Sequence, residues 1–213
     1  MKKAILFDFD GTLANTLPLV IFCFQEVFRK SISREFSGDD IVGMFGPTEE
    51  GLLRAMIPER SYEETAETFF RLYRDRHADF VEDSKDIARV VRALAEDGYK
   101  LGICTGKGRR TMDISSGYLS FCGYFDAIVT GDDMERPKPN PDGLFTCLKM
   151  LNVAPEDAVY VGDSNADVAA GKSAGLTTIG VKWMPITQSR EFRPSPDYEF
   201  SDFDEFLQTV RDL

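Results

Sequence analysis

Two aspartates, Asp8 and Asp10, end an apolar run near the start of the chain, in the segment ILFDFDGTLANT at residues 5–16. Side chains two residues apart lie on the same side of an extended chain. A carboxylate can attack phosphorus and form an aspartyl-phosphate. A second carboxylate beside it can protonate the leaving oxygen and then activate a water molecule. The pair therefore predicts phosphoryl chemistry, with one aspartate as nucleophile and its neighbour as acid and base.

Further polar residues follow other strand-like runs, and they are Thr105, Gly106, Lys138, Asp163 and Asp167. In a parallel sheet, ligands bind at the carboxyl ends of the strands, where these residues would meet. Acids gathered there would repel one another unless a cation lay between them, and a set of oxygen ligands suits Mg²⁺. Lys138 and the cation would neutralise phosphate oxygens, while the Thr105 hydroxyl and the Gly106 N–H would donate hydrogen bonds to them.

The elements that must position these residues alternate between short apolar runs and helical patterns. The expected strands are residues 4–10, 100–106, 125–131, 158–164 and 177–183. Helical spacing of apolar residues fills 84–97, and a second helix is expected to begin at Asn140 and Pro141. Runs that are apolar on both faces suit buried parallel strands. The pattern predicts an α/β fold, a Rossmann-like parallel-sheet core covered by helices on both sides.

Residues 15 to about 82 break this alternation, because they contain no convincing strand. Thr16 to Pro18 is typical of a helix start, and Ser61 to Glu64 has the spacing of a capping box. Aromatic residues then recur at helical spacing. We therefore expect an inserted all-helical cap domain at 15–82, and a catalytic core domain formed by 1–14 and 83–213.

Composition excludes several function classes. The 213 residues carry 36 acids against 25 lysines and arginines, a net charge of -11. Such a surface repels phosphate backbones and anionic lipids, so we expect neither a nucleic-acid nor a membrane partner. No run is long and apolar enough to span a bilayer. The four cysteines form no CxxC pair, which favours reduced thiols and a cytoplasmic location. Composition leaves the oligomeric state open.

Four segments occur in a characteristic order: DFDGTL, ICTG, the lysine of RPKPNP, and GDSNAD. Together they resemble the motifs of the haloacid-dehalogenase superfamily, from residue 4 to about 183, with the helical insertion where that family carries its small cap. The resemblance implies that Asp8 is nucleophile and metal ligand, and that Asp10 is acid and base and binds metal through its backbone carbonyl. It implies that Thr105 binds the phosphoryl group, Lys138 stabilises it, and Asp163 binds metal. Asp167 would lie behind these ligands, holding Lys138 or a metal-bound water.

Some positions differ between the branches of that superfamily, and they narrow the set of reactions that the resemblance implies. Asp10 is absent from dehalogenases and phosphonate-cleaving members, so its presence favours phosphate esters. Sugar-phosphate mutases usually carry a histidine where this chain has Val20, which disfavours mutase activity. Asn15 stands where an aspartate is common, near the hinge of the cap. Phosphoglycolate phosphatases and a related group of pyrophosphatases resemble the chain most, so a small phosphorylated metabolite is the expected substrate.

Several assignments have competing interpretations. A receiver-like signalling module also gathers acids, a hydroxyl and a lysine, but it carries its phosphate acceptor on the third strand and has no helical insertion after the first. Arg54 and Arg74 of the cap are candidates for contact with an anionic substrate, although such residues more often form a solvated helix face. His77, the only histidine, falls on the apolar face of its helix and is expected to be packed.

Overall fold

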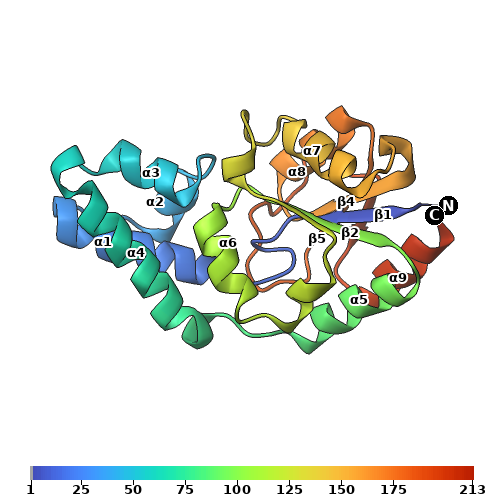
Figure 1. Ribbon diagram of the computed structural model, residues 1–213, viewed down its shortest axis with the longest axis horizontal. Helices are drawn as coiled ribbons and strands as arrows, with labels where there is room; N and C mark the ends of the chain where they lie inside the picture. Colours follow the sequence, from blue (N-terminus) through green and yellow to red (C-terminus); the bar gives the residue numbers. More distant parts are fainter. Residues whose placement is uncertain (1) are drawn as a thin grey trace.

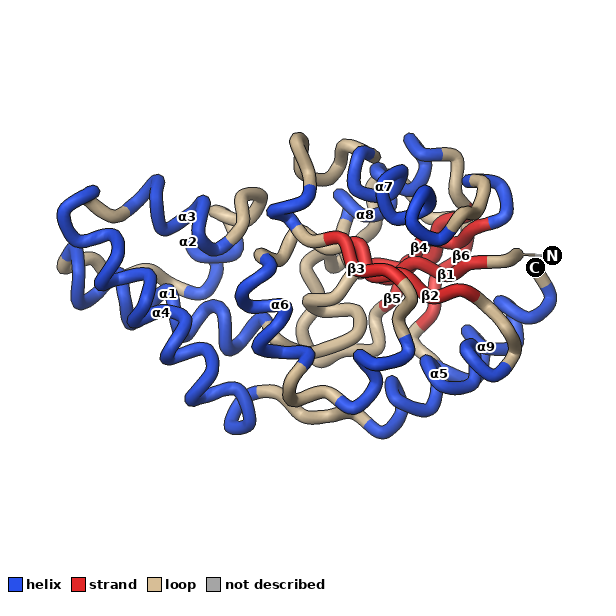
Figure 2. The backbone as a smooth tube through the Cα atoms, in the orientation of Figure 1, coloured by secondary structure: helices blue, strands red, loops and turns tan. Residues whose placement is uncertain are grey.

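Six parallel strands form one sheet in the computed structural model, which describes residues 2–213 (Figures 1 and 2). The strands are β1 (Ala4–Phe7), β2 (Lys100–Cys104), β3 (Ala127–Val129), β4 (Ala158–Gly162), β5 (Thr177–Val181) and β6 (Tyr198–Phe200). Their order is β3-β2-β1-β4-β5-β6, which places β1 in the middle of the sheet. Phe7, its last residue, pairs with Ile103 of β2 and Val161 of β4. The polar residues that follow these three strands are therefore neighbours.

Helices cover both faces of the sheet (Figure 1). One face is packed by α5 (Lys85–Glu96) and α9 (Phe203–Asp212), and the other by α7 (Asp142–Leu151) and α8 (Asn165–Ala174). The alternation of side chains along β1 explains the two layers. Ile5 and Phe7 belong to the cluster with α5 and α9, whereas Ala4 and Leu6 belong to the cluster with α7 and α8. Every residue of β1 is buried, as a central strand requires.

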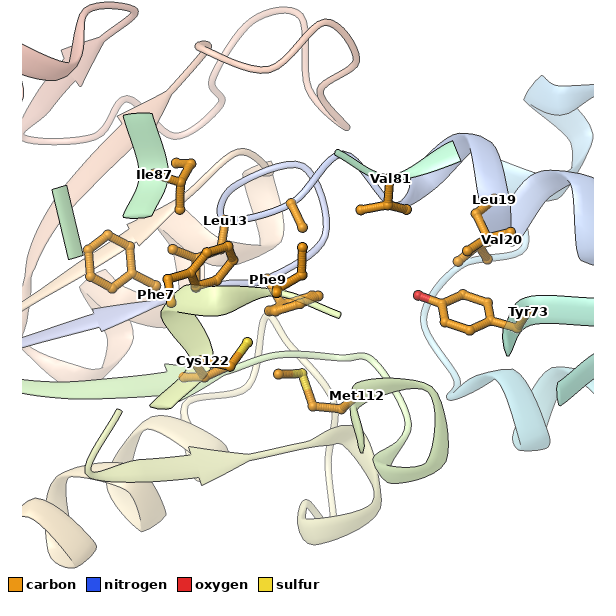
Figure 3. Packing of buried hydrophobic residues seen from close by; sticks show 14 of the residues in the cluster. Phe7, Phe9, Leu13, Leu19, Val20, Tyr73, Val81, Ile87, Met112 and Cys122 are labelled. Atoms are coloured by element: carbon orange, nitrogen blue, oxygen red, sulfur yellow. The ribbon is translucent and has the colours of Figure 1, made fainter. Parts of the chain in front are cut away.

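Four helices form a separate unit beside the carboxyl edge of the sheet, which we name the cap (Figure 1). They are α1 (Leu17–Ile32), α2 (Gly38–Val42), α3 (Glu49–Met56) and α4 (Glu59–Phe80). The helix α6 (Arg109–Ser116) packs against α4 from the sheet side. Figure 3 shows one apolar cluster continuing from Phe7 and Phe9, at β1, to Val20 and Tyr73 of the cap. Packing thus fixes the cap against the edge where the predicted site lies.

Three short 3₁₀ helices lie in the connections at Ser120–Tyr124, Gly131–Asp133 and Pro155–Asp157.

Aromatic rings pack the cap helices together, among them Phe24 with Phe69, whose ring centroids are 4.7 Å apart. His77 is fully buried on α4 and stacks on Tyr118, with 4.5 Å between the ring centroids. It is therefore a packed residue, as its place on the apolar face indicated. Within residues 2–213, no helix is both long and apolar enough to cross a membrane.

The predicted fold class is confirmed, and three local expectations are wrong. The strand β6 was not expected, because it has only three residues and sits at the sheet edge without an apolar run. The helix α7 begins at Asp142 with Pro141 at the N-cap, while Asn140 accepts a hydrogen bond from the Asp142 N–H. No capping box forms at Ser61, since α4 already begins at Glu59 and the Ser61 hydroxyl donates to the Pro58 carbonyl.

Candidate active site

A cavity of about 180 Å³ lies between the carboxyl edge of the sheet and the cap. Its floor is made by residues that follow β1, β2 and β4, together with Lys138. The cap contributes an apolar wall and one carboxylate, and the wall residues are Leu17, Val20, Phe24, Phe45, Pro47 and Leu52. The topology therefore brings Asp8, Asp10, Thr105, Gly106 and Lys138 to one cavity at the carboxyl edge of the sheet, whereas Asp163 and Asp167 are not among its lining residues.

Asp8 occupies the centre of the floor, directly after the last residue of β1. Its side chain is almost fully buried, and its Oδ1 lies 2.8 Å from the Lys138 Nζ. Burial raises the pKa of Asp8 to about 6, against the opposing effect of the Lys138 charge. At neutral pH the carboxylate is ionised and paired with a single cationic side chain, which suits a nucleophile.

Lys138 reaches the floor from the loop between β3 and α7, flanked by Pro137 and Pro139. Its Nζ donates to the Asp167 Oδ1 at 2.6 Å and to the Tyr160 hydroxyl at 3.0 Å, as well as to Asp8. Burial alone lowers the pKa of Lys138, but the charges of Asp167 and Asp8 outweigh it and raise the pKa. The lysine is therefore held as a cation beside Asp8.

Asp167 lies in the first turn of α8, and its carboxylate is fully engaged. Besides the contact with Lys138, its Oδ2 accepts from the Ser164 N–H at 3.0 Å and from the Ser164 hydroxyl, in a capping box. Its Oδ1 also accepts from the Tyr160 hydroxyl at 2.9 Å. Of the two roles that the resemblance implied for Asp167, the contact with Lys138 is present, and the contact with a metal-bound water stays a prediction.

Asp8, Asp163 and Asp167 form an acidic cluster, in which one carboxylate oxygen of each lies within 4.8 Å of the others. Asp163 follows β4 and is fully buried. Burial raises its pKa well above the usual range, and the charges of Asp167 and Asp8 raise it further. Such a site is short of positive charge and offers only oxygen donors. The donor set therefore fits Mg²⁺, although the cluster contains Asp167 where the sequence analysis expected Asp10.

Asp10 belongs to the tight loop after β1, and its side chain contacts Thr16 and Lys107. The Thr16 hydroxyl donates to its Oδ1, and the Lys107 Nζ lies 3.0 Å from the same oxygen. Gly11 makes the loop possible, because its φ is +84° and a Cβ there would lie 2.8 Å from the Asp163 Cγ. Asp8 and Asp10 thus line the same cavity with different partners.

Thr105 and Gly106 follow β2 and also line the cavity. Thr105 is buried, and its hydroxyl oxygen accepts from the Lys107 N–H at 3.3 Å. Both residues line the same cavity as Asp8. Both can donate to a phosphoryl oxygen placed there.

Three residues near the site were not predicted from the sequence as site residues: Glu49, Lys107 and Gln188. Glu49 belongs to α3 of the cap and Lys107 to the turn after β2. Gln188, after β5, donates through its backbone N–H to the Asp163 Oδ2 at 2.6 Å and through its Nε2 to the Asp10 carbonyl at 3.3 Å. For Lys107, its place directly after Thr105 and Gly106 was a usable clue. For the other two, only the folded chain reveals the contact.

The two cap arginines do not reach the cavity. Arg54 is exposed, and its guanidinium lies over the Tyr62 ring, 4.1 Å from the centroid. Arg74 is exposed on α4. Neither residue is among those that line the cavity. The expectation that they contact the substrate is thus at odds with the structure, because their helices turn these positions toward solvent.

Comparisons with known proteins agree with this geometry. The family described as haloacid dehalogenase-like hydrolase matches residues 5–181. The pyrophosphatase PpaX of Bacillus cereus is 31% identical over 211 residues, which are 99% of this chain and 97% of that protein. A predicted phosphoglycolate phosphatase from Haemophilus somnus superimposes with a TM-score of 0.84 at 21% identity, over 98% of each chain. CbbY from Rhodobacter sphaeroides, solved with phosphate, gives 0.82 at 23% identity over 97% of this chain and 96% of that one. These two structures share the fold.

Proposed function

Because this chain belongs to the haloacid dehalogenase-like hydrolase family and is a phosphatase within it, we propose that it hydrolyses a small phosphate monoester through an aspartyl-phosphate on Asp8. The observation that carries this proposal is the pairing of Asp8 with Lys138 at 2.8 Å, with Asp10 facing the same cavity. One carboxylate is thereby set as an ionised nucleophile, and a second stands beside the path of the leaving group.

In the first half of the reaction, an oxygen of Asp8 forms a bond to phosphorus while the bond from phosphorus to the ester oxygen breaks. Asp10 gives its proton to that leaving oxygen, which departs as an alcohol. Lys138, the Thr105 hydroxyl and the Gly106 N–H stabilise the charge on the non-bridging oxygens. The burial of Asp8 excludes bulk water from the nucleophile, which strengthens these contacts.

In the second half, the Asp10 carboxylate takes a proton from a water molecule that attacks the phosphorus of the aspartyl-phosphate. The bond from phosphorus to the Asp8 oxygen then breaks, which releases inorganic phosphate and restores the Asp8 carboxylate. Both halves use the same two residues, and Asp10 alternates between acid and base. Turnover distinguishes this enzyme from a signalling module, which would hold the phosphoryl group on aspartate.

Asp8, Asp163 and the backbone carbonyl of Asp10 would hold Mg²⁺, and Asp167 would orient Lys138 behind them. When bound, the ion supplies positive charge to the phosphoryl oxygens. The donor set supports this assignment, because Asp8 and Asp163 offer only oxygen donors and burial raises the pKa of both, so that an added cation would stabilise their charged forms. Gln188 donates to the Asp163 carboxylate and to the Asp10 carbonyl, so its N–H groups help to orient these two oxygen donors.

Phosphoglycolate is the first substrate to test, and pyrophosphate is the second. Likeness to the structure described as a predicted phosphoglycolate phosphatase favours the former. The 31% identity with PpaX over nearly the whole chain favours the latter. A cavity of about 180 Å³ supports a leaving group of a few heavy atoms in either case. The four cysteines are free and buried, which supports the cytoplasm as the compartment.

The test compares Asp8→Asn with Asp10→Asn in phosphate release from a panel of small esters and pyrophosphate with Mg²⁺. Asp8→Asn is expected to abolish turnover, because no nucleophile remains. Asp10→Asn is expected to slow it by about two to four orders of magnitude, the usual effect of losing a general acid and base. Near-normal turnover by Asp8→Asn would contradict the covalent route. A stable phosphoprotein without phosphate release would instead indicate a signalling module.

A further inference from the structure

Lys107 is the second lysine that lines the cavity, and its side chain is fully buried. Its Nζ lies 3.0 and 3.4 Å from the two carboxylate oxygens of Asp10 and 3.3 Å from the Glu49 Oε1. The remaining side of the ammonium faces the Tyr73 ring, 4.8 Å from its centroid. Burial alone lowers the pKa of Lys107, but Asp10, Tyr73 and Glu49 outweigh it and raise the pKa, so the group is a cation.

Glu49 is the only charged residue of the cap among those that line the cavity. It lies in the first turn of α3 and is 7% exposed, yet all the hydrogen-bond partners of its side chain belong to the core. Its carboxylate accepts from the Gly108 N–H at 2.7 Å, from the Thr111 hydroxyl at 2.7 Å, and from Lys107. A buried carboxylate is tolerated only with such partners. The contact therefore exists only while the cap rests on the core.

Gly108 leaves the room for this contact. A Cβ at that position would lie 2.9 Å from the Glu49 Oε2, which is closer than real Cβ contacts allow. The φ of Gly108 is -68°, an ordinary value that any residue adopts, so the backbone does not require glycine there. The glycine matters for the approach of the carboxylate, and the position offers a steric probe of the contact.

We propose that Glu49 is a positioning residue, which holds Lys107 when the cap is closed so that Lys107 holds Asp10 in place to protonate the leaving group. This inference rests on the proposed function, in which Asp10 is the general acid. The chain of contacts runs from the cap to the acid in two links, Glu49 to Lys107 and Lys107 to Asp10. When the cap lifts, Glu49 leaves with it and Lys107 loses one of the two carboxylates that fix its ammonium.

A different role for Lys107, as receptor for an anionic leaving group, fits the contacts less well. Two carboxylates and an aromatic face already surround the ammonium, so an anion would first have to displace Glu49. The positioning role needs no displacement. It also explains why a cap carboxylate is buried against core donors beside an otherwise apolar wall.

The test compares two esters that differ in whether the leaving group needs a proton from Asp10. An alkyl phosphate has a poor leaving group that needs a proton, whereas the 4-nitrophenolate of 4-nitrophenyl phosphate departs without one. The ratio kcat/KM reports the steps up to transfer onto Asp8 and excludes the later hydrolysis. For Glu49→Gln we expect kcat/KM to fall about 10- to 100-fold with the alkyl ester, part of the usual worth of a general acid, and less than about threefold with the aryl ester.

Glu50→Gln is the matched control, because Glu50 is the next residue of α3 and does not line the cavity. This variant should leave kcat/KM unchanged with both esters. Gly108→Ala should reproduce the selective loss by displacing the carboxylate, and it keeps the test open if Glu49→Gln folds poorly. In a Lys107→Met background, Glu49→Gln should add little further loss, since residues that act through one another are not additive.

Equal losses with the two esters, or losses that add fully in the double variant, would overturn the positioning role. A loss confined to esters whose alcohol carries an additional negative charge, whether or not that alcohol needs a proton to depart, would overturn it in favour of an anion receptor. Failure of the proposed function is a separate result, in which the wild-type enzyme with Mg²⁺ releases phosphate from neither ester.

Discussion

Gly11 and Gly98 provide a matched pair that measures the crowding around Asp163. Both have left-handed backbone conformations, with φ of +84° and +87°. An added Cβ at Gly98 would meet nothing within 4 Å, whereas at Gly11 it would lie 2.8 Å from the Asp163 Cγ. Alanine at either position therefore introduces the same backbone strain, and only Gly11→Ala also pushes against the site.

The magnitudes follow from these two contributions. A positive φ costs a residue with a Cβ about 1–2 kcal/mol. Overpacking a fixed neighbour costs about 1–3 kcal/mol more. Asp163 cannot yield easily, because it is fully buried and its Oδ2 accepts from the Gln188 N–H at 2.6 Å. We expect the free energy of unfolding to fall by about 1–2 kcal/mol in Gly98→Ala and about 2–5 kcal/mol in Gly11→Ala.

Urea unfolding measures the loss of stability in each variant. A titration of activity with Mg²⁺ measures whether Gly11→Ala also displaces Asp163. Gly11→Ala should need more Mg²⁺ for half-maximal turnover, because a proposed ligand is displaced, while Gly98→Ala should match the wild type. If both variants lose the same stability and keep the same Mg²⁺ requirement, the packing of Gly11 against Asp163 has no functional weight and the reasoning fails.

Three further predictions concern charge. Mg²⁺ affinity, measured by calorimetry, should fall as the pH drops below about 6, where Asp8 takes up a proton; constant affinity from pH 8 to 5 would contradict this. Lys138→Met should abolish most turnover and destabilise the metal-free chain by about 3–5 kcal/mol at pH 8, because it leaves buried carboxylates unpaired; unchanged thermal unfolding would refute it. Burial lowers the pKa of His77 to about 4. Between pH 6.5 and 4 only the unfolded state binds that proton, so wild-type stability should fall by about 3 kcal/mol relative to His77→Gln over that range, and parallel urea midpoints would count against it.

The core of the site could be predicted from the sequence because strands alternate with helices. Once that alternation is recognised, the residues after each strand must meet at one edge of the sheet. Asp8 and Asp163 needed no knowledge of packing beyond this rule, whereas Lys138, in the loop after β3, was selected by its place in the order of the four motifs. Their chemical types then limited the chemistry, because clustered carboxylates beside a lysine suit a cation and a phosphoryl group.

The cap resisted prediction because helical periodicity gives the buried face of a helix but not its partner. Arg54 and Glu49 both belong to α3, yet one lies over a tyrosine at the surface and the other reaches core donors. Gln188 lies in a segment without regular structure, where no periodicity exists to read. The edge strand β6 was missed for a related reason, since it has only three residues, two of them exposed, and these form no apolar pattern.

The segment after β5 links the acidic cluster to the only tryptophan of the chain. The backbone N–H of Gln188 donates a hydrogen bond to Asp163. Five positions earlier, Trp183 donates from its indole N–H to the Thr12 carbonyl at 2.7 Å. Thr12 in turn belongs to the loop that carries Asp10. One end of this short stretch thus contacts a proposed metal ligand, and the other contacts the loop that carries Asp10. We therefore expect the fluorescence of Trp183 to change when Mg²⁺ is added without substrate.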